Sequence, residues 1–200
     1  MTSLRRALTD PPLRPLPDKA RELLEALEAP PRLAAHLRAV HDVAWQLADW
    51  VERHHPTAAF DRDAVLFGAA VHDIGKTVHL GELSGPGSAH EPAGYEILLT
   101  HGVEARWARF ARDHGSWGTA SDLDDLLVSL ADKVWKAKRV QDLEQLVTDR
   151  LAMASGQEPW QVFMALDDEL SRIAAGADHR LAFQTSYPVT AAASGPRDPA

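Results

Sequence analysis

The stretch Phe60–Lys76, FDRDAVLFGAAVHDIGK, joins the most apolar run of the chain to a histidine, an aspartate and a lysine. Its AVLFGAAV segment is apolar on every side, which predicts a buried central helix from about Arg62 to His72, ended by Gly75. Burying an imidazole and a carboxylate at the end of such a helix is costly unless each has a partner. His72 and Asp73 therefore either reach water at the helix end or contribute to a metal site whose other ligands lie elsewhere in the chain.

The composition is that of a soluble globular domain, with 200 residues, 45% hydrophobic and 25% charged. There is no cysteine, which excludes disulfides, thiolate metal sites and cysteine nucleophiles, so any metal must be bound through nitrogen and oxygen. The net charge of −8 argues against broad nucleic-acid binding. No apolar run has the length of a membrane span and the first residues lack the apolar core of a signal peptide, so we expect a cytoplasmic protein with no membrane partner.

Hydrophobic periodicity predicts an all-α fold. In the segment 31–55, apolar residues recur at spacings of three and four and form one stripe: Leu33, Leu37, Val40, Ala44, Leu47 and Val51. Further helices are expected at about 18–29, 62–72, 91–100, 104–114, 123–137, 141–154 and 159–175. A short extended piece within RLAFQTSYPV is the one strand considered.

The chain is predicted to form one helical domain with irregular ends. Residues 1–17, rich in proline, are expected to be a flexible lead-in, and residues 177–200 an extended or disordered tail. The domain at 18–176 would consist of a motif core at about 32–140 and added C-terminal helices at 141–175, whose role is packing, homodimer formation or a lid.

Several polar residues occupy positions that the predicted helices direct inward. His36 lies on the apolar stripe, His114 on the inward face of its helix, and Asp132 inside the apolar LLVSLADKVW. His90 stands at a junction between loop and helix. One such histidine alone is more often a hydrogen-bonded core residue than a metal ligand. Together with His72 and Asp73 they favour a metal site, because a divalent cation offsets the charge and the lost hydration of buried carboxylates.

The order H…HD…H…H…D, with HDIGK at its second element, resembles the HD-domain superfamily of all-α metal-dependent phosphohydrolases over about residues 32–140. The resemblance implies an HD-type helical bundle with extra C-terminal helices. It also implies two divalent ions, with iron or manganese favoured and zinc, nickel, cobalt or magnesium as alternatives. Four residues match the ligands of the single-metal site, and two match the pair added in two-metal members, where Asp73 bridges: His36, His72, Asp73 and Asp132, then His90 and His114.

The resemblance implies hydrolysis of a nucleotide or another small phosphorylated metabolite, as a phosphomonoesterase or a phosphodiesterase. Asp73 and Lys76 are the candidate catalytic residues. Lys76 and Lys133 are the candidate phosphate contacts, since an ammonium group binds phosphate as a point charge. Arg38 and Arg112 are weaker candidates for the same role.

Three points stay open at the level of the sequence. A di-iron oxygenase of the same superfamily uses the same ligand types, and a non-catalytic module that binds a nucleotide in signalling is a third hypothesis. Glu91 is ambiguous, because the spacing from Ser88 to Glu91 fits a helix capping box, and we expect capping rather than catalysis.

Overall fold

The computed structural model describes residues 2–190, and within that range the chain forms ten α-helices and two short 3₁₀ helices with no strand. The prediction of an all-α fold is therefore confirmed. None of the helices between residues 2 and 190 combines the length and the apolar character needed to cross a bilayer. The elements are α1 (Ser3–Thr9), α2 (Asp18–Ala26), α3 (Pro31–His54), α4 (Arg62–Val71), η1 (Ile74–Thr77), η2 (Leu80–Leu83), α5 (His90–Thr100), α6 (Ala105–Asp113), α7 (Leu123–Val134), α8 (Gln141–Ser155), α9 (Pro159–Ala174) and α10 (Ala177–Thr185).

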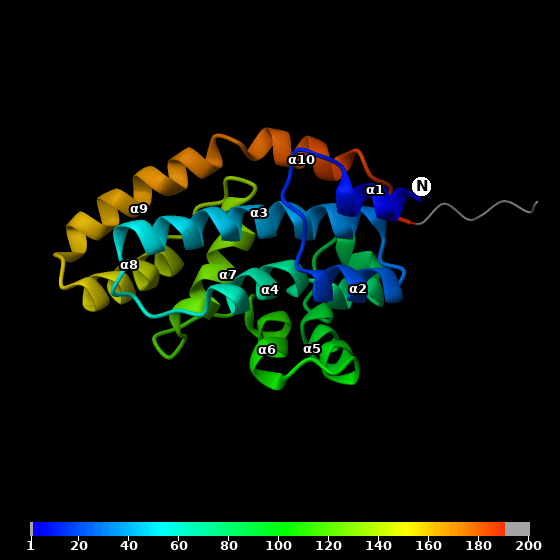
Figure 1. Cartoon of the computed structure of the whole chain (residues 1–200), viewed down its shortest axis with the longest axis horizontal. Helices are drawn as coiled ribbons and strands as arrows, with labels where there is room; N and C mark the ends of the chain where they lie inside the picture. The colour runs from blue at the N-terminus through cyan, green and yellow to red at the C-terminus, as the bar shows by residue number, and fades with distance from the viewer. Residues whose placement is uncertain (1, 191–200) are drawn as a thin grey trace, which may run out of the picture.

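Helix α3 is the longest element and runs through the middle of the molecule (Figure 1). Pro31 occupies its first turn, where a proline costs no hydrogen bond. The predicted apolar stripe is buried along its whole length, from Leu33 to Val51. Helices α1, α4, α7 and α10 all pack against α3, so a side chain carried by α3 can meet side chains from distant parts of the sequence.

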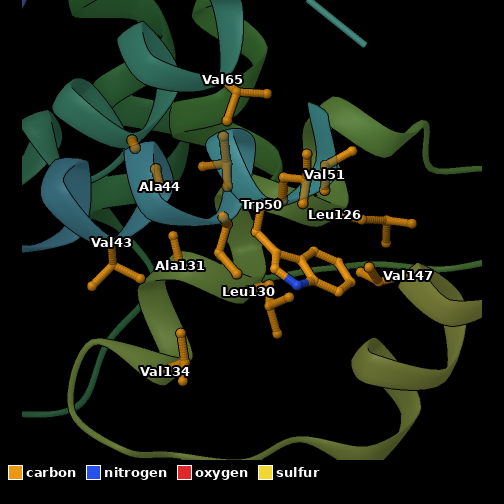
Figure 2. Close-up of a cluster of buried hydrophobic side chains, with 14 of the residues drawn as sticks. Val43, Ala44, Trp50, Val51, Val65, Leu126, Leu130, Ala131, Val134 and Val147 are labelled. Carbon is orange, nitrogen blue, oxygen red and sulfur yellow. The ribbon is translucent and has the colours of Figure 1, made fainter. Parts of the chain in front are cut away.

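The core on the C-terminal half of α3 is built from residues of α3, α4, α7, α8 and α9, together with Phe110 of α6. Figure 2 shows the indole of Trp50 among Val51, Leu126, Leu130 and Val147, contributed by α3, α7 and α8. Helix α9 completes this core with a buried apolar face that includes Val162, Leu166 and Leu170. The added C-terminal helices thus cover apolar surface of α3 and α7. Helix α4 is buried as its sequence predicts, with every residue from Ala64 to Val71 except Leu66 inaccessible to solvent or nearly so.

The prediction of a flexible lead-in at residues 1–17 is wrong for most of that segment. Helix α1 forms there, and its Ala7 and Leu8 are buried. The guanidinium of Arg38, whose side chain is 1% exposed, donates hydrogen bonds to four carbonyl oxygens, those of Ala7 (2.9 Å), Asp10 (2.8 Å), Leu13 (2.5 Å) and Arg14 (3.3 Å). A proline-rich segment can be ordered without regular structure when a buried donor satisfies its carbonyl groups. Arg38 is therefore directed away from any phosphate contact, and that expectation is also wrong.

The extended tail predicted from residue 177 is likewise wrong for residues 177–185, which form α10, so the short strand considered in RLAFQTSYPV does not occur. Tertiary hydrogen bonds hold this region. The Tyr187 hydroxyl donates to Asp10 Oδ2 (2.7 Å), and Arg180 Nε donates to the carbonyl oxygen of Trp135 (2.7 Å). Both ends of the described chain therefore pack on the same part of the molecule, as the neighbouring α1 and α10 show in Figure 1. Residues 191–200 of the predicted tail lie outside the described range.

Candidate metal centre

The structure brings all six predicted ligand residues to one place. They come from five separate places in the chain, and each is at most 8% exposed: His36 on α3, His72 and Asp73 just after α4, His90 at the start of α5, His114 after α6, and Asp132 on α7. The helix ends place the side chains, since His72 and His114 cap the C-termini of α4 and α6.

The glycine of HDIGK permits this convergence. A Cβ added at Gly75 would overlap the carbonyl oxygen of His90 and lie 2.7 Å from the nitrogen of Gly94. Only a residue without a side chain lets η1 approach the first turns of α5 this closely. The close contact places the His72–Asp73 pair beside His90.

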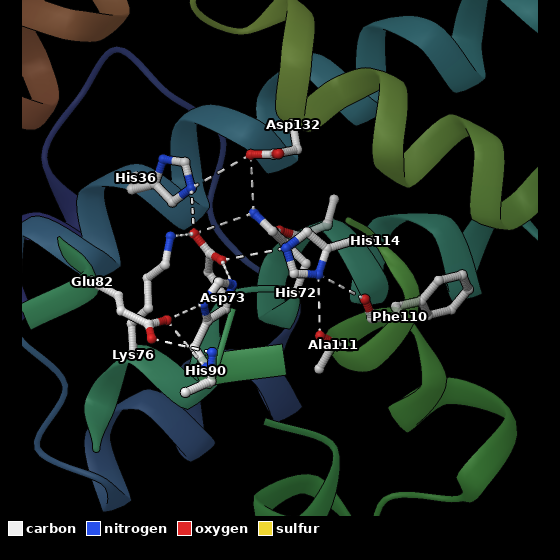
Figure 3. Close-up of polar contacts among 12 residues, drawn as sticks. His36, His72, Asp73, Lys76, Glu82, His90, Phe110, Ala111, His114 and Asp132 are labelled. Carbon is white, nitrogen blue, oxygen red and sulfur yellow. Dashed lines mark hydrogen bonds and ion pairs between the residues drawn. The ribbon is translucent and has the colours of Figure 1, made fainter. Parts of the chain in front are cut away.

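Asp73 lies at the centre of the cluster, and its two oxygens face different histidines (Figure 3). Oδ1 is 2.9 Å from His90 Nε2 and 3.5 Å from His114 Nε2. Oδ2 is 3.1 Å from His36 Nε2 and 3.6 Å from His72 Nε2. One carboxylate thus lies between two pairs of imidazoles.

Asp132 belongs to one side of this arrangement. Its Oδ1 is 3.4 Å from His72 Nε2 and 3.9 Å from His36 Nε2. One donor atom from each of these three residues lies within 4.8 Å of the other two, a spacing that a single metal ion can bridge.

In three of the histidines, the Nδ1 atom lies within hydrogen-bond distance of an oxygen acceptor. His72 Nδ1 lies 3.0 Å from the carbonyl oxygen of Ala69, and His114 Nδ1 lies 3.1 Å from that of Ala111. A carbonyl oxygen only accepts, so each Nδ1 carries the hydrogen and each Nε2 directs a lone pair toward Asp73. This is the arrangement that orients imidazole ligands of metals.

Glu82 orients the third histidine, and sequence reasoning missed it. Its Oε2 is 2.5 Å from His90 Nδ1, and its two oxygens also accept hydrogen bonds from the backbone nitrogens of Ala89 (3.1 Å) and His90 (3.2 Å). Glu82 lies in η2, within a glycine-rich segment and eight residues before His90, and no local spacing rule joins the two positions.

The capping box expected from Ser88 to Glu91 is wrong. Helix α5 begins at His90 with Ala89 as its N-cap and has no capping bond from a nearby side chain. Pro92 then falls at the third helical position, where it has no N–H for a capping oxygen. Glu82, from outside the helix, supplies the carboxylate at this helix start.

The electrostatics keep the carboxylates ionised and favour the neutral imidazole at His36 and His114. Burial favours the neutral acid, but the imidazoles of His72, His36 and His90 hold the pKa of Asp73 well below its usual range. His72 and Lys133 lower the pKa of Asp132 in the same way, against its own burial. Metal ligands must be in these states, since a proton on a donor atom competes with the cation.

The histidines differ in how readily they give up a proton. Burial lowers the pKa of His36, and it lowers that of His114 to about 4. For His90 burial acts in the same direction, but the carboxylates of Asp73 and Glu82 outweigh it and raise the pKa. A proton on His90 is therefore harder for a bound cation to displace than a proton on His36 or His114.

The donor set fits divalent metal ions. Four buried atoms at the centre have no hydrogen-bond partner among the described residues: His36 Nε2, His72 Nε2, His90 Nε2 and Asp73 Oδ1. Buried polar atoms nearly always have partners, so a cluster of unpartnered donor atoms that face one another is suited to bind a cation. Nitrogen and carboxylate oxygen donors suit first-row transition metals and exclude none of those expected from the sequence.

Two lysines line the edge of the centre. Lys76 Nζ is 2.6 Å from Asp73 Oδ2, and Lys133 Nζ is 2.6 Å from Asp132 Oδ2. Both side chains are partly exposed, and the Lys133 ammonium also lies 5.6 Å from the ring centre of Trp117. Arg112, by contrast, is paired with the neighbouring Asp113 at the surface, so it makes no contact with the centre.

The fold and the site together define an all-helical protein with a buried cluster of histidines and aspartates suited to divalent cations. A family model described as HD domain matches residues 20–135, more than half of the chain. The chain therefore belongs to the HD-domain family, which lies within a superfamily of metal-dependent hydrolases. No curated protein and no solved structure matched the chain.

Proposed function

We propose that the protein is a phosphohydrolase that depends on divalent metal and acts on a nucleotide or another small phosphorylated metabolite. One observation carries the proposal: unpartnered imidazole nitrogens and ionised carboxylates converge beside two ammonium groups that remain partly accessible. Such a combination pairs a site for cations with a site for the oxygens of a phosphate group.

The donors divide into two sets that share Asp73. His36, His72 and Asp132 would hold one ion with Asp73 Oδ2, and His90 and His114 would face a second with Asp73 Oδ1. When bound, divalent ions lower the pKa of water and neutralise charge on a phosphate ester. We propose iron or manganese for both positions, in keeping with nitrogen and oxygen ligands.

The residues of the chain bind and orient the substrate. At the edge of the centre, Lys76 is paired with Asp73 and Lys133 with Asp132. Their ammonium groups would therefore bind different oxygens of one phosphate group. The buried rings exclude water from the sides of the site and hold the carboxylates in place, which preserves strong electrostatic interactions with the substrate.

The test measures phosphate or nucleoside release from a panel of mono-, di- and polyphosphates after the chelated protein is supplied with manganese or iron. We expect turnover by the native chain, none by Asp73→Asn, and full turnover by Asp49→Asn, which changes an aspartate on the same helix as His36 but far along it. If freshly metallated protein released neither phosphate nor nucleoside from any substrate, the proposal would be refuted. Oxygen consumption by the iron form without phosphate release would equally overturn it.

A further inference from the structure

The two sides of the centre have unequal numbers of protein donors. His36, His72 and Asp132 together with one oxygen of Asp73 make four donors on one side. On the other side, His90 and His114 share only the second oxygen of Asp73. The second side therefore has three protein donors, one fewer than the first, and its remaining coordination position is open to water or to a further side chain.

Glu91 is in position to supply that donor. It follows His90 in the first turn of α5, and one of its carboxylate oxygens lies within 4.8 Å of a ring nitrogen of His90 and of His114. The three residues form a group separate from the one made by His36, His72 and Asp132.

The next residue after His114 makes room for this carboxylate. Gly115 packs directly against Glu91 Oε1, so that a Cβ at position 115 would overlap the oxygen. A side chain there would displace the carboxylate from its place beside His114. The glycine therefore keeps Glu91 near the centre.

No other interaction accounts for the position of the Glu91 carboxylate in the described part of the chain. Its side chain makes no hydrogen bond and no ion pair with the residues between 2 and 190, and the start of α5 is capped by Glu82 instead. Beside it, His90 Nε2 is buried and lacks a hydrogen-bond partner, which is an independent sign that a cation belongs on this side.

We propose that Glu91 is the fourth protein donor for the ion on the His90–His114 side. The inference rests on the proposed function in so far as that function uses two ions. It gives this chain a ligand set of three carboxylates and four imidazoles, in which each ion is bound by two histidines, one carboxylate of its own and the shared Asp73.

The test counts metal ions in Glu91→Gln. The amide keeps the shape of the side chain but loses its charge, and Glu96→Gln on the exposed face of α5 is the matched control. Chelated proteins are titrated with Mn²⁺ by calorimetry, and the spin coupling of paired Mn²⁺ ions is followed by electron paramagnetic resonance.

We expect two bound ions with a coupled spectrum for the native chain and for Glu96→Gln. Glu91→Gln should keep one ion at native affinity, bind the second about tenfold or more weakly and lose the coupled spectrum. Glu91→Ala must show the same loss, and circular dichroism must show native helix content for both variants. Two ions bound by Glu91→Gln with native affinity would overturn the inference.

Phosphate release measured on the same samples separates this inference from the proposed function. Hydrolysis by a native chain that binds a single ion would refute the role of Glu91 and leave the proposed function standing. Two ions in the native chain, one in Glu91→Gln, and no hydrolysis by either protein would support the role of Glu91 and refute the function.

Discussion

Arg38 is expected to hold the N-terminal segment in place, and its replacement by methionine should destabilise the protein strongly. The side chain is buried and carries a positive charge. Its hydrogen bonds go to four backbone carbonyl oxygens of residues 7–14, which are neutral acceptors. Methionine has a similar reach and keeps the apolar contacts of the stem, so the substitution isolates the guanidinium group.

The magnitude follows from the number of contacts. A hydrogen bond that involves a charged group contributes about 1.5–3 kcal/mol, so four of them contribute roughly 6–12 kcal/mol before other terms. The cost of burying the cation offsets several kcal/mol of that sum. We therefore expect Arg38→Met to lower the free energy of unfolding by about 3–5 kcal/mol, a large part of the total stability of an ordinary domain.

The assay is urea unfolding followed by far-ultraviolet circular dichroism, with hydrogen exchange of residues 3–14 as a local measurement. Arg53→Met is the control, because Arg53 lies on the same helix, is exposed, and among residues 2–190 forms its hydrogen bonds and ion pair with Asp49 one turn before it. That control should change stability by less than about 0.5 kcal/mol. If Arg38→Met lost less than about 1 kcal/mol and its N-terminal amides stayed protected, the reasoning would be refuted.

Three further predictions concern the metal centre. Lys76→Met should reduce phosphate release about 100-fold without lowering metal content, because the ammonium group contacts Asp73 but is not a metal ligand. Kinetics and metal analysis of one sample check both parts, and metal loss would contradict the assignment. Glu82→Gln should weaken binding of one ion about 10–100-fold, since His90 Nδ1 loses its anionic acceptor, and an unchanged calorimetric titration would argue against this role. Metal affinity should rise as pH increases above about 6.5, the ordinary pKa of histidine, because the pKa of His90 is raised and its proton must leave, whereas His114, with a pKa of about 4, is already neutral. Affinity measured from pH 6 to pH 8.5, as about six spaced titrations, checks the sign, and a flat or falling profile would exclude His90 as a ligand.

Much of the fold was predictable because it depends on patterns within single helices. The apolar spacing along α3 and the uniformly apolar α4 identify both helices, and the inward positions of His36, His114 and Asp132 follow from the same periodicity. Helix geometry places these residues on the same face as core residues, and the apolar character of that face predicts that it is buried.

What could not be predicted depends on contacts between segments far apart in the sequence. The order in residues 3–14 depends on Arg38, more than twenty residues further along the chain. Helix α10 is held by Arg180 against Trp135, and local composition does not show that contact. Glu82 was missed for the same reason, since a glycine-rich loop gives no periodic signal, and its role appears only when the loop folds back on His90.

The contact between Arg180 and Trp135 has a consequence for where this protein can be divided. The family match ends at Trp135, whose ring packs edge-on against that of His36 with 4.8 Å between ring centres. Its carbonyl oxygen accepts from a helix more than forty residues beyond that boundary. A fragment cut to residues 20–135 would retain all six matched ligands and Glu91, yet it would lose the anchor of Trp135, the carbonyl acceptors of Arg38 and the apolar cover that α8 and α9 give to α7. The shortest piece that folds on its own is therefore expected to extend from α1 to α10, well beyond the segment by which its family is recognised.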